Sequence, residues 1–156
     1  MIHLMRAHAA DAEALTAISH RAFDNDVNYG HTGPGGPPGY DSVEWQRQAI
    51  AGAEYYGIYE DDRLIGGVII ATGGSSEREL WRVYLEPECQ NRGIGSQVLE
   101  LVWAQYPFIT RWRLDTPNWN DRTRHFYARH GFIEVGTTPD GLVLFERRSA
   151  PPRPVL

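Results

Sequence analysis

The residue types and spacing that point most directly to chemistry lie in one short loop, Gln90-Asn91-Arg92-Gly93-Ile94-Gly95-Ser96. A strand-like apolar run (80–85) enters this loop, and apolar residues at helical spacing (94–102) leave it. The first turn of a helix carries unpaired N–H groups at the positive end of its dipole, so it can hold a phosphate. Glycine lets the main chain approach such an anion, and Arg92 can add charge-assisted hydrogen bonds. The alternative is a tight turn that needs glycine only for its dihedral angles.

Two common nucleotide-binding patterns fail at this loop. A P-loop has Lys-Ser or Lys-Thr after its second glycine, whereas Ser96 and Gln97 follow Gly95 here. The dinucleotide pattern G-x-G-x-x-G needs a glycine where Val98 stands. A nucleotide-hydrolysing enzyme is therefore disfavoured. The pattern that fits is Gln-x-x-Gly-x-Gly between a strand and an amphipathic helix.

A second stretch, residues 120–132, reads Asn-Asp-Arg-Thr-Arg-His-Phe-Tyr-Ala-Arg-His-Gly-Phe. In this order and spacing the two motifs resemble the GNAT superfamily of acyl-CoA-dependent N-acetyltransferases, and the resemblance is clear over residues 55–146. It implies the GNAT fold, an α/β (α+β) domain with a central mixed, mostly antiparallel sheet of about seven strands flanked by four helices. In that fold the strands before and after the loop's helix splay apart, and the pantetheine arm of CoA lies between them.

The resemblance implies acetyl-CoA as acyl donor and co-substrate, and it assigns the donor's contacts residue by residue. The pyrophosphate would lie on the whole loop, Gln90, Asn91, Arg92, Gly93, Ile94, Gly95 and Ser96. The pantetheine would pair as an added strand with the main chain at Val83, Tyr84 and Leu85, and an N–H there would polarise the thioester carbonyl. Asn120 stands where the family contacts the cofactor arm; it can also cap a helix, and the two roles are compatible.

Tyr127 matches the family's tyrosine before the Gly-Phe pair and is the candidate general acid. A phenol holds its proton at neutral pH, so it can donate to the leaving thiolate. The alternative is a core tyrosine that packs beside Phe126.

The general base stays open between Glu79, His31 and water. An alkyl ammonium is almost fully protonated at pH 7, so some group must take its proton. Glu79 begins the strand before the loop, a position from which some GNAT members project a glutamate, although a plain surface carboxylate is an equal reading. Histidine is the side chain suited to proton transfer near neutral pH, so His31 would serve if the segment around it closes over the site.

A covalent acyl-enzyme would need an activated nucleophile. Cys89 is the only thiol, and it precedes the loop, so we expect it far from the acetyl group. Direct transfer in a ternary complex is therefore predicted. Two alternatives stay open: a non-catalytic acyl-CoA-binding or sensing module, and a transferase that uses a longer acyl donor. The presence of Asn120 and Tyr127 favours an enzyme over a mere binder.

The acceptor site of GNAT proteins lies at the early helices and the loop between them. The candidate acceptor-binding residues in that region are Asp26, Tyr29, His31 and Tyr40. Carboxylates among aromatic rings suit a cationic amine through charge pairing and cation–π contact. A solvated acidic surface with packing aromatics is the competing reading. The predicted partner is a small-molecule primary amine or amino-acid derivative.

Hydrophobic periodicity then predicts the elements that position these residues. Helices are predicted over residues 10–23, 43–53, 94–105 and 120–131. Strands are predicted over residues 2–6, 56–59, 63–71, 77–86, 109–116, 132–136 and 142–147. The long segment 24–41 is rich in Gly and Pro, and such segments in compact domains are either functional or disordered. We expect one domain over 1–148 and a Pro-rich tail over 149–156.

The chain has 156 residues and a formal net charge of −5, which suits one domain with a sizeable core and disfavours a nucleic-acid partner. There is no transmembrane run and no signal-peptide profile, so no membrane partner is predicted. A single cysteine excludes an internal disulfide and fits a reducing interior, which makes the cytoplasm the expected compartment. No metal site is predicted. Because GNAT domains often dimerise, a homodimer is an open alternative to a monomer.

Overall fold

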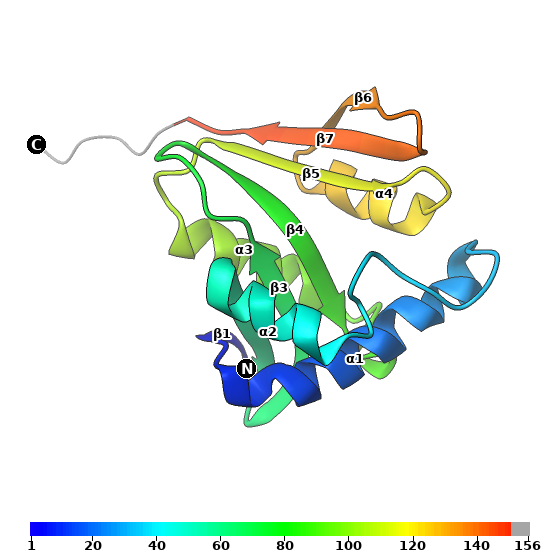
Figure 1. The fold of residues 1–156 in the computed structure, drawn as a ribbon. Helices are drawn as coiled ribbons and strands as arrows, with labels where there is room; N and C mark the ends of the chain where they lie inside the picture. Colours follow the sequence, from blue (N-terminus) through cyan, green and yellow to red (C-terminus); the bar gives the residue numbers. More distant parts are fainter. Residues whose placement is uncertain (151–156) are drawn as a thin grey trace, which may run out of the picture.

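The computed structural model describes residues 1–150, and in it four helices pack on one sheet (Figure 1). Residues 151–156, the end of the predicted tail, lie outside the described range. Short 3-10 turns cover Ala9–Asp11 (η1), Asn25–Tyr29 (η2) and Pro87–Cys89 (η3). In chain order the other elements are β1 (Ile2–Arg6), α1 (Ala12–Asp24), α2 (Val43–Gly52), β2 (Glu54–Glu60), β3 (Arg63–Ile70), β4 (Glu77–Leu85), α3 (Ile94–Gln105), β5 (Arg111–Pro117), α4 (Asp121–Arg129), β6 (Ile133–Thr137) and β7 (Leu142–Arg148).

The strands form a seven-stranded sheet in the order β1-β2-β3-β4-β5-β7-β6. Every neighbouring pair is antiparallel except β4 and β5, which are parallel and are joined through α3. A parallel pair needs such a crossover, whereas the hairpins between β2 and β3 and between β6 and β7 need only short turns. The predicted fold, a mixed and mostly antiparallel sheet of seven strands with four helices, is confirmed.

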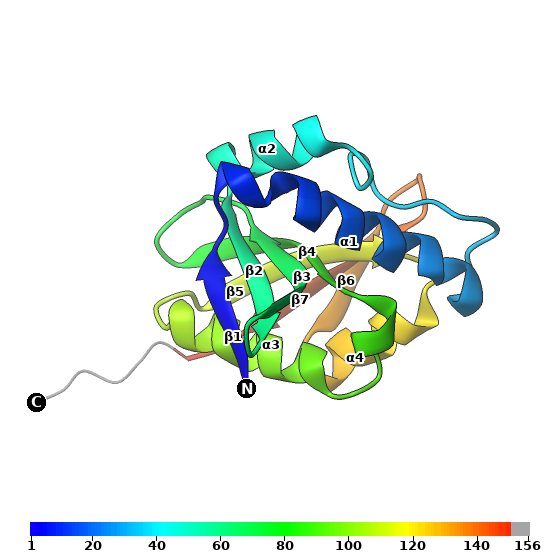
Figure 2. The same ribbon diagram turned by 90° about the horizontal axis from the view of Figure 1, so that it is seen from below.

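The helices cover the two faces of the sheet separately, α1 and α2 on one face and α3 and α4 on the other (Figure 2). On the first face Leu15 and Ile18 of α1 are buried in one cluster with Ile69 of β3. On the second face Val98 of α3 is buried in another cluster with Val68 of β3. Because β3 is buried on both faces, its sequence is continuously apolar rather than alternating.

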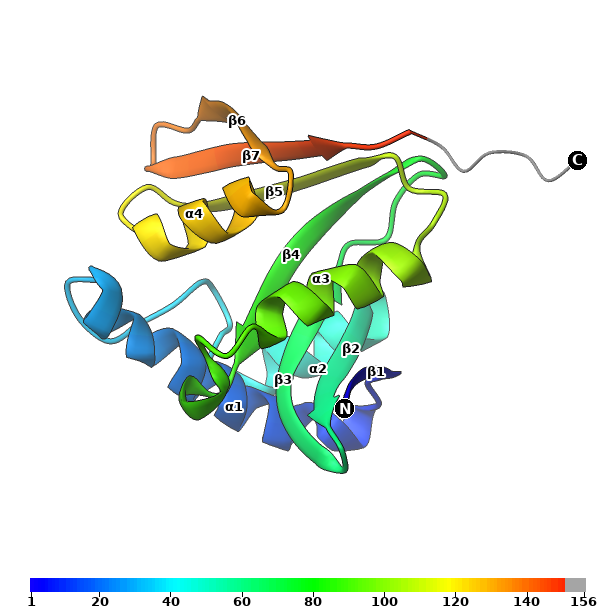
Figure 3. The same ribbon diagram turned by 180° about the vertical axis from the view of Figure 1, so that it is seen from behind.

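The sheet is split between β4 and β5. These strands pair only at Glu77–Arg111, Arg78–Trp112 and Glu79–Arg113, and beyond that point they diverge toward the end of α1 (Figures 1 and 3). Where the divergence begins, the register between β3 and β4 shifts, so Trp81 has no partner on β3. Such a bulge bends a strand and increases its local twist, which turns β4 away from β5.

The Gly/Pro-rich segment packs against the helices on either side of it. A Cβ on Gly36 would lie 2.7 Å from Cβ of Phe23 in α1. Gly39 has a φ of +79°, and a Cβ there would lie 2.0 Å from the Trp45 ring of α2. Both positions therefore need glycine for close approach, and Gly39 also needs it for its left-handed backbone. The segment is a packed wall beside the split rather than a loose connection.

Candidate functional site

A cavity of about 890 Å³ occupies the split between β4 and β5. Its walls come from β4, the loop before α3, β5, α4 and the Gly/Pro-rich segment. The structure brings most of the predicted site residues to this cavity, namely Val83, Tyr84, Leu85, Gln90, Asn91, Gly93, Gly95, Ser96, Asn120, Tyr127, Asp26 and His31. Segments about 100 residues apart in the chain thus meet around one space.

Five predicted residues do not line the cavity, and four of them lie near it in sequence or space. Ile94 is buried in the core under α3, and Arg92 turns to Glu60, with 2.9 Å between Nη2 and Oε2. The Tyr40 hydroxyl donates to an Asp24 carboxylate oxygen at 3.0 Å. Tyr29 lies at the edge, where its hydroxyl accepts a hydrogen bond from the side chain of the cavity residue Asn91 at 3.1 Å. The Arg92 guanidinium is thus paired with a protein carboxylate outside the cavity.

The structure does not bring Glu79 to the cavity either. Glu79 occupies the last paired position of β4, beside Arg113, where the two strands are still joined. Its carbonyl accepts a hydrogen bond from the amide of Ala71 at 3.0 Å, which completes the sheet there. The prediction that Glu79 is the base placed it before the split opens, because the sequence does not show where the pairing ends.

The loop before α3 is shaped to present main-chain N–H groups. Asn91 and Gly93 both have left-handed backbone, with φ of 60° and 78°. Gly93 is the N-cap of α3 and no side chain caps this end, so the first-turn N–H groups lack a side-chain acceptor. A Cβ on Gly95 would lie 3.1 Å from the Phe126 ring of α4. The two glycines therefore serve different purposes: Gly93 makes the turn, and Gly95 lets α3 and α4 approach.

A polar cluster joins η2, the loop and α4 across the wide end of the split. Arg122 donates from Nη1 to Gln90 Oε1 at 2.7 Å and from Nη2 to Asp26 Oδ1 at 3.2 Å. Its guanidinium also lies 3.7 Å from the centroid of the Tyr29 ring. Burial raises the pKa of the Asp26 carboxyl, and the Arg122 charge opposes that shift only in part. Asp26 and Tyr29, predicted to bind the acceptor, are thus held against α4 by Arg122, which the sequence reading missed.

Tyr127 is held by aromatic side chains and faces the cavity. Phe126, Phe132 and Phe145 surround its ring, with centroids 5.2, 5.5 and 6.4 Å away. Burial raises the pKa of the phenol, and the Asp115 carboxylate raises it further. The packed-core reading and the cavity-facing reading of Tyr127 are therefore compatible, since the ring packs while the residue lines the cavity.

Asn120 caps α4, as predicted, because its Oδ1 accepts a hydrogen bond from the amide of Thr123 at 3.2 Å. It is 3% exposed and lines the cavity. One amide side chain thus both ends the β5–α4 connection and faces the space where β5 leaves β4.

Two carboxylates on the cavity wall were missed by the sequence reading. Asp115 lies on β5, where Trp112, Leu114 and Thr116 alternate into the core, so Asp115 points to the opposite face. Its side chain stays exposed to solvent, but partial burial of the carboxyl and the nearby Asp140 carboxylate raise its pKa. The alternation of β5 is the signal that could have found Asp115.

The wall on the side of α2 is made of aromatic and basic groups. Trp81, left out of the ladder by the bulge, is 46% exposed and lines the cavity. The His31 ring stacks on Trp119 with 4.6 Å between centroids, and its Nδ1 is buried without a partner among residues 1–150. Arg82 lies 3.9 Å over the Trp45 ring and also lines the cavity.

Tyr84 contributes main chain rather than its hydroxyl to the cavity wall. The hydroxyl is buried in a short hydrogen bond with that of Tyr55, which in turn donates to Gln46 Oε1 at 2.5 Å. Burial raises the pKa of the Tyr55 phenol to about 12 and raises that of Tyr84 as well. Both phenols therefore stay protonated and join β2, β4 and α2.

Cys89 is fully buried in the core beneath the loop, and burial raises the pKa of its thiol. A thiol is a nucleophile only as thiolate, so this environment disfavours a covalent route. Cys89 is also absent from the residues that line the cavity.

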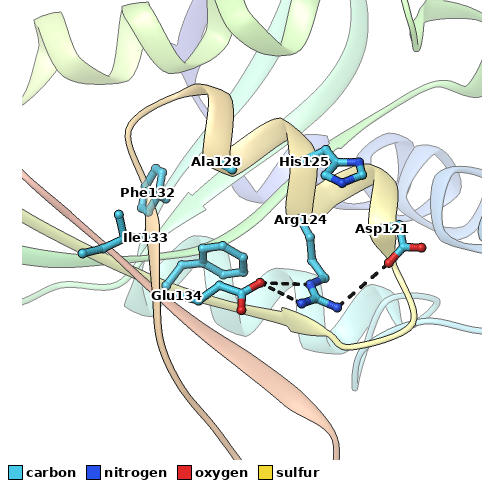
Figure 4. A pocket seen from close by; sticks show the side chains of 8 residues that line it. Asp121, Arg124, His125, Ala128, Phe132, Ile133 and Glu134 are labelled. Atoms are coloured by element: carbon cyan, nitrogen blue, oxygen red, sulfur yellow. Dashed lines mark hydrogen bonds and ion pairs between the residues drawn. The ribbon is translucent and has the colours of Figure 1, made fainter.

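A smaller hollow of about 520 Å³ lies between α4 and β6 (Figure 4). Arg124 crosses it to Glu134 of β6, with 2.8 Å between Nη2 and Oε1, and reaches Asp121 at 4.0 Å. Its charged groups are thus paired with one another, and none of the predicted site residues lines it.

No group of three or more His, Cys, Asp or Glu residues within 1–150 is arranged to hold a metal ion. In the same part of the chain, every helix is too short or too polar to span a bilayer.

Comparison with known families identifies the family to which this fold belongs. A family model described as an acetyltransferase (GNAT) domain matches residues 51–134, more than half of the chain. The chain belongs to the GNAT acetyltransferase family. The matched range contains β4, the loop before α3, Asn120 and Tyr127, so the resemblance inferred from the two motifs is confirmed.

Solved structures agree with this GNAT assignment at the level of the fold. The PaiA N-acetyltransferase from Thermoplasma acidophilum, in complex with coenzyme A, is 21% identical, with 96% of this chain and 99% of that chain covered and a TM-score of 0.74. An acetyltransferase from Thermus thermophilus is 18% identical, with coverage of 96% and 97% and a TM-score of 0.79. A GNAT family acetyltransferase from Elizabethkingia anophelis with acetyl-CoA bound is 20% identical, with coverage of 76% and 95% and a TM-score of 0.59.

Membership of the GNAT family supports acyl transfer as the activity of this chain. Structural neighbours bind coenzyme A or acetyl-CoA. The loop fits an anionic group of that kind because α3 begins without a side-chain cap, and the residues Gly93, Gly95 and Ser96 around that end line the cavity.

Proposed function

We propose that this GNAT protein is an N-acetyltransferase that transfers the acetyl group of acetyl-CoA to a small-molecule primary amine in a ternary complex. The observation that carries the proposal is the composition of one cavity. Unpaired β4 main chain, the uncapped start of α3 and the Tyr127 side chain all face the same space. These are the groups that a thioester, a pyrophosphate and a leaving thiolate require.

The donor is held mainly by main chain. The first-turn N–H groups of α3, at Ile94, Gly95 and Ser96, bind the pyrophosphate, and the helix dipole adds to that attraction. The segment of β4 beyond Glu79 no longer pairs with β5, so the main chain at Val83 and the N–H of Leu85 are open to the pantetheine amides, while the Leu85 carbonyl accepts a hydrogen bond from the Gln90 side chain at 3.1 Å. A β4 N–H polarises the thioester carbonyl as it becomes an oxyanion.

Tyr127 serves the leaving group, and Asp115 serves the amine. The amine nitrogen forms a bond to the thioester carbon as the carbon–sulfur bond breaks. Asp115 takes the proton that the nitrogen loses, directly or through water, and Tyr127 donates to the departing sulfur. The products are an amide and a thiol, and a proton passed on from Asp115 restores the phenol. Asp115 replaces Glu79 in this role because it lines the cavity, and its carboxyl has a raised pKa.

The test measures thiol release from acetyl-CoA with a panel of primary amines, for the wild type and for Tyr127→Phe. We expect turnover in the wild type and a kcat lower by roughly 10²-fold or more in the variant, with donor affinity retained. Tyr106→Phe is the matched control, because Tyr106 packs on Trp112 and bonds to the Tyr56 hydroxyl, outside the cavity.

Silence in both proteins while CoA still binds would contradict the proposal and favour a non-catalytic acyl-CoA-binding module. Turnover only with propionyl-CoA or longer donors would instead contradict the choice of acetyl group.

A further inference from the structure

The cavity carries a positive charge that no protein carboxylate balances. Arg82 stacks on Trp45 and donates from Nη2 to the carbonyl of Pro38 at 2.5 Å. Its Nη1 is buried without a partner among residues 1–150. Burial lowers the pKa of the guanidinium, and the only charged or polar groups that oppose this are the hydroxyls of Tyr55 and Tyr84. A guanidinium remains charged at neutral pH, so Arg82 lacks an anionic partner among residues 1–150.

The opposite wall has the complementary imbalance. Asp115 and Asp140 both line the cavity, the Asp140 charge raises the pKa of the Asp115 carboxyl, and no cation in the described residues contributes to that pKa. Asp140 accepts a hydrogen bond from the Thr138 hydroxyl but pairs with no basic group in residues 1–150. Two unpaired carboxylates side by side favour a bound cation.

Arg82 and Asp115 lie on the same side of the sheet. The last pair of the β4–β5 ladder is Glu79–Arg113, so Arg82 and Asp115 come just after it on their own strands. Arg82 packs on α2, and Asp115 points away from the core under α3, so both belong to the face that α1 and α2 cover. Both residues line the cavity, and they form no ion pair with each other.

We propose that the acceptor is a zwitterion of amino-acid type, a small primary amine that carries a carboxylate on the same molecule. This deepens the proposed function and rests on it. Arg82 binds the carboxylate through its unpartnered Nη1, since a guanidinium forms strong charge-assisted hydrogen bonds to a carboxylate. Asp115 and Asp140 bind the ammonium, which loses one proton to solvent before it attacks, and Asp115 takes the second proton as the amide forms. Trp81 offers an exposed ring on the same wall to the rest of the molecule.

A dication such as a polyamine fits this site less well, because it would leave Arg82 uncompensated and would be repelled by it. The amino terminus of a protein also fits less well, because its carboxyl group is an amide and gives Arg82 a neutral partner.

The first experiment compares matched acceptors in the wild type at saturating acetyl-CoA. Each pair is an amino acid and its decarboxylated amine: methionine and 3-(methylthio)propylamine, phenylalanine and phenethylamine, tryptophan and tryptamine. We expect kcat/KM to favour at least one amino acid over its amine by about 10²-fold or more, because a buried charge left without its partner is costly. Equal or faster turnover of all the decarboxylated amines would overturn the proposal while leaving the proposed function intact.

The second experiment uses Arg82→Gln on the preferred pair. We expect KM for the amino acid to rise by about 10- to 10²-fold, kcat to change little, the decarboxylated amine to be unaffected, and Arg82→Lys to recover part of the loss. Arg113→Gln is the control, because Arg113 is exposed on the same face of β5 as Asp115 and does not line the cavity. An equal fall for both acceptors would show that Arg82 only clamps Pro38 and Trp45, and it would overturn the proposal.

A binding measurement separates failure of this proposal from failure of the proposed function. Calorimetric titration of the amino acid and of its amine into CoA-saturated protein reports the preference without any turnover. Preferential binding of the amino acid with no reaction would contradict the proposed function and support the zwitterion site. Binding of the amine alone would overturn the zwitterion site whether or not the protein is active.

Discussion

Tyr127 combines a tightly packed position with its proposed role as general acid. Three phenylalanine rings hold it in place, and its environment raises the pKa of the phenol. A phenol with a raised pKa is a weaker acid than a thiol, whose ordinary pKa is about 8.5. Donation is therefore most useful while the carbon–sulfur bond is breaking, and Tyr127 should affect kcat more than donor affinity.

Asp115 leads to a prediction about pH. A base must be ionised to accept a proton, and the pKa of the Asp115 carboxyl is raised by its surroundings and by Asp140. Activity should therefore rise with pH through this raised value, with an acidic limb above the ordinary range near 4. In a pH profile of kcat/KM, Asp115→Asn should lower the rate and remove this limb.

Asp140→Asn sharpens that measurement. Without the Asp140 charge the pKa of Asp115 falls, so the limb should move to lower pH. Asp62→Asn, in the exposed turn between β2 and β3, should leave the profile unchanged. A limb that stays in place in Asp115→Asn would show that another group is the base.

A short sequence motif indicates residues that act through their own main chain or local position. It does not indicate residues whose role depends on a partner far away in the chain. The loop glycines, Asn120 and Tyr127 lie within two short motifs, and all of them line the cavity. Arg82 and Asp115 were not predicted as site residues, because only the fold brings their two strands to one cavity. Glu79 was assigned by strand position, and the pairing with Arg113 holds it outside the cavity.

Among the elements, the Gly/Pro-rich segment is fixed by two close contacts. Gly39→Ala would force a Cβ into the Trp45 ring at a φ of +79°. We expect this change to destabilise the protein by about 2–5 kcal/mol and to lower Tm by about 5–15 °C. Thermal unfolding of the purified variant is the measurement.

Gly33→Ala is the matched control in the same segment. No atom lies within 4 Å of a Cβ built there, so this change should be nearly neutral or slightly stabilising. Similar losses in both variants would mean that the segment responds to any substitution, which would contradict a specific contact with Trp45.

The identities of the elements could be read from periodicity, with boundaries that differ by a few residues. The predicted strand from 109 begins at Arg111, because the amide of Ile109 closes a turn onto the carbonyl of Tyr106 at 3.1 Å. The bulge at Trp81 and the point where β4 leaves β5 could not be read, since both depend on pairing between strands far apart in the chain.

At the scale of the whole molecule, the sheet consists of two halves, β1 to β4 and β5 to β7, which are joined only at one end of β4 and β5. Three residue pairs connect them, and Arg111 reinforces the join through Glu77 of β4 and Glu146 of β7, at 2.9 and 2.8 Å. With so few bonds between them, the halves should open as separate cooperative units.

A ligand that pairs with both halves should couple them. At a CoA concentration about 100 times its Kd, binding adds about 2.7 kcal/mol to the free energy of unfolding. Hydrogen exchange of the amides in residues 82–85 and 114–116 should slow together when CoA is added. Protection confined to the loop before α3 would contradict a donor that runs between the strands.

The split between β4 and β5 has one more consequence, which concerns how substrates enter the cavity and how products leave it. The cavity is lined both by residues that face α1 and by residues of α3 and α4 on the other side, so it passes through the plane of the sheet. The proposed donor and acceptor can then enter the cavity from opposite faces of the sheet. On this geometry neither substrate has to bind first, and each product can leave by the side from which its parent came.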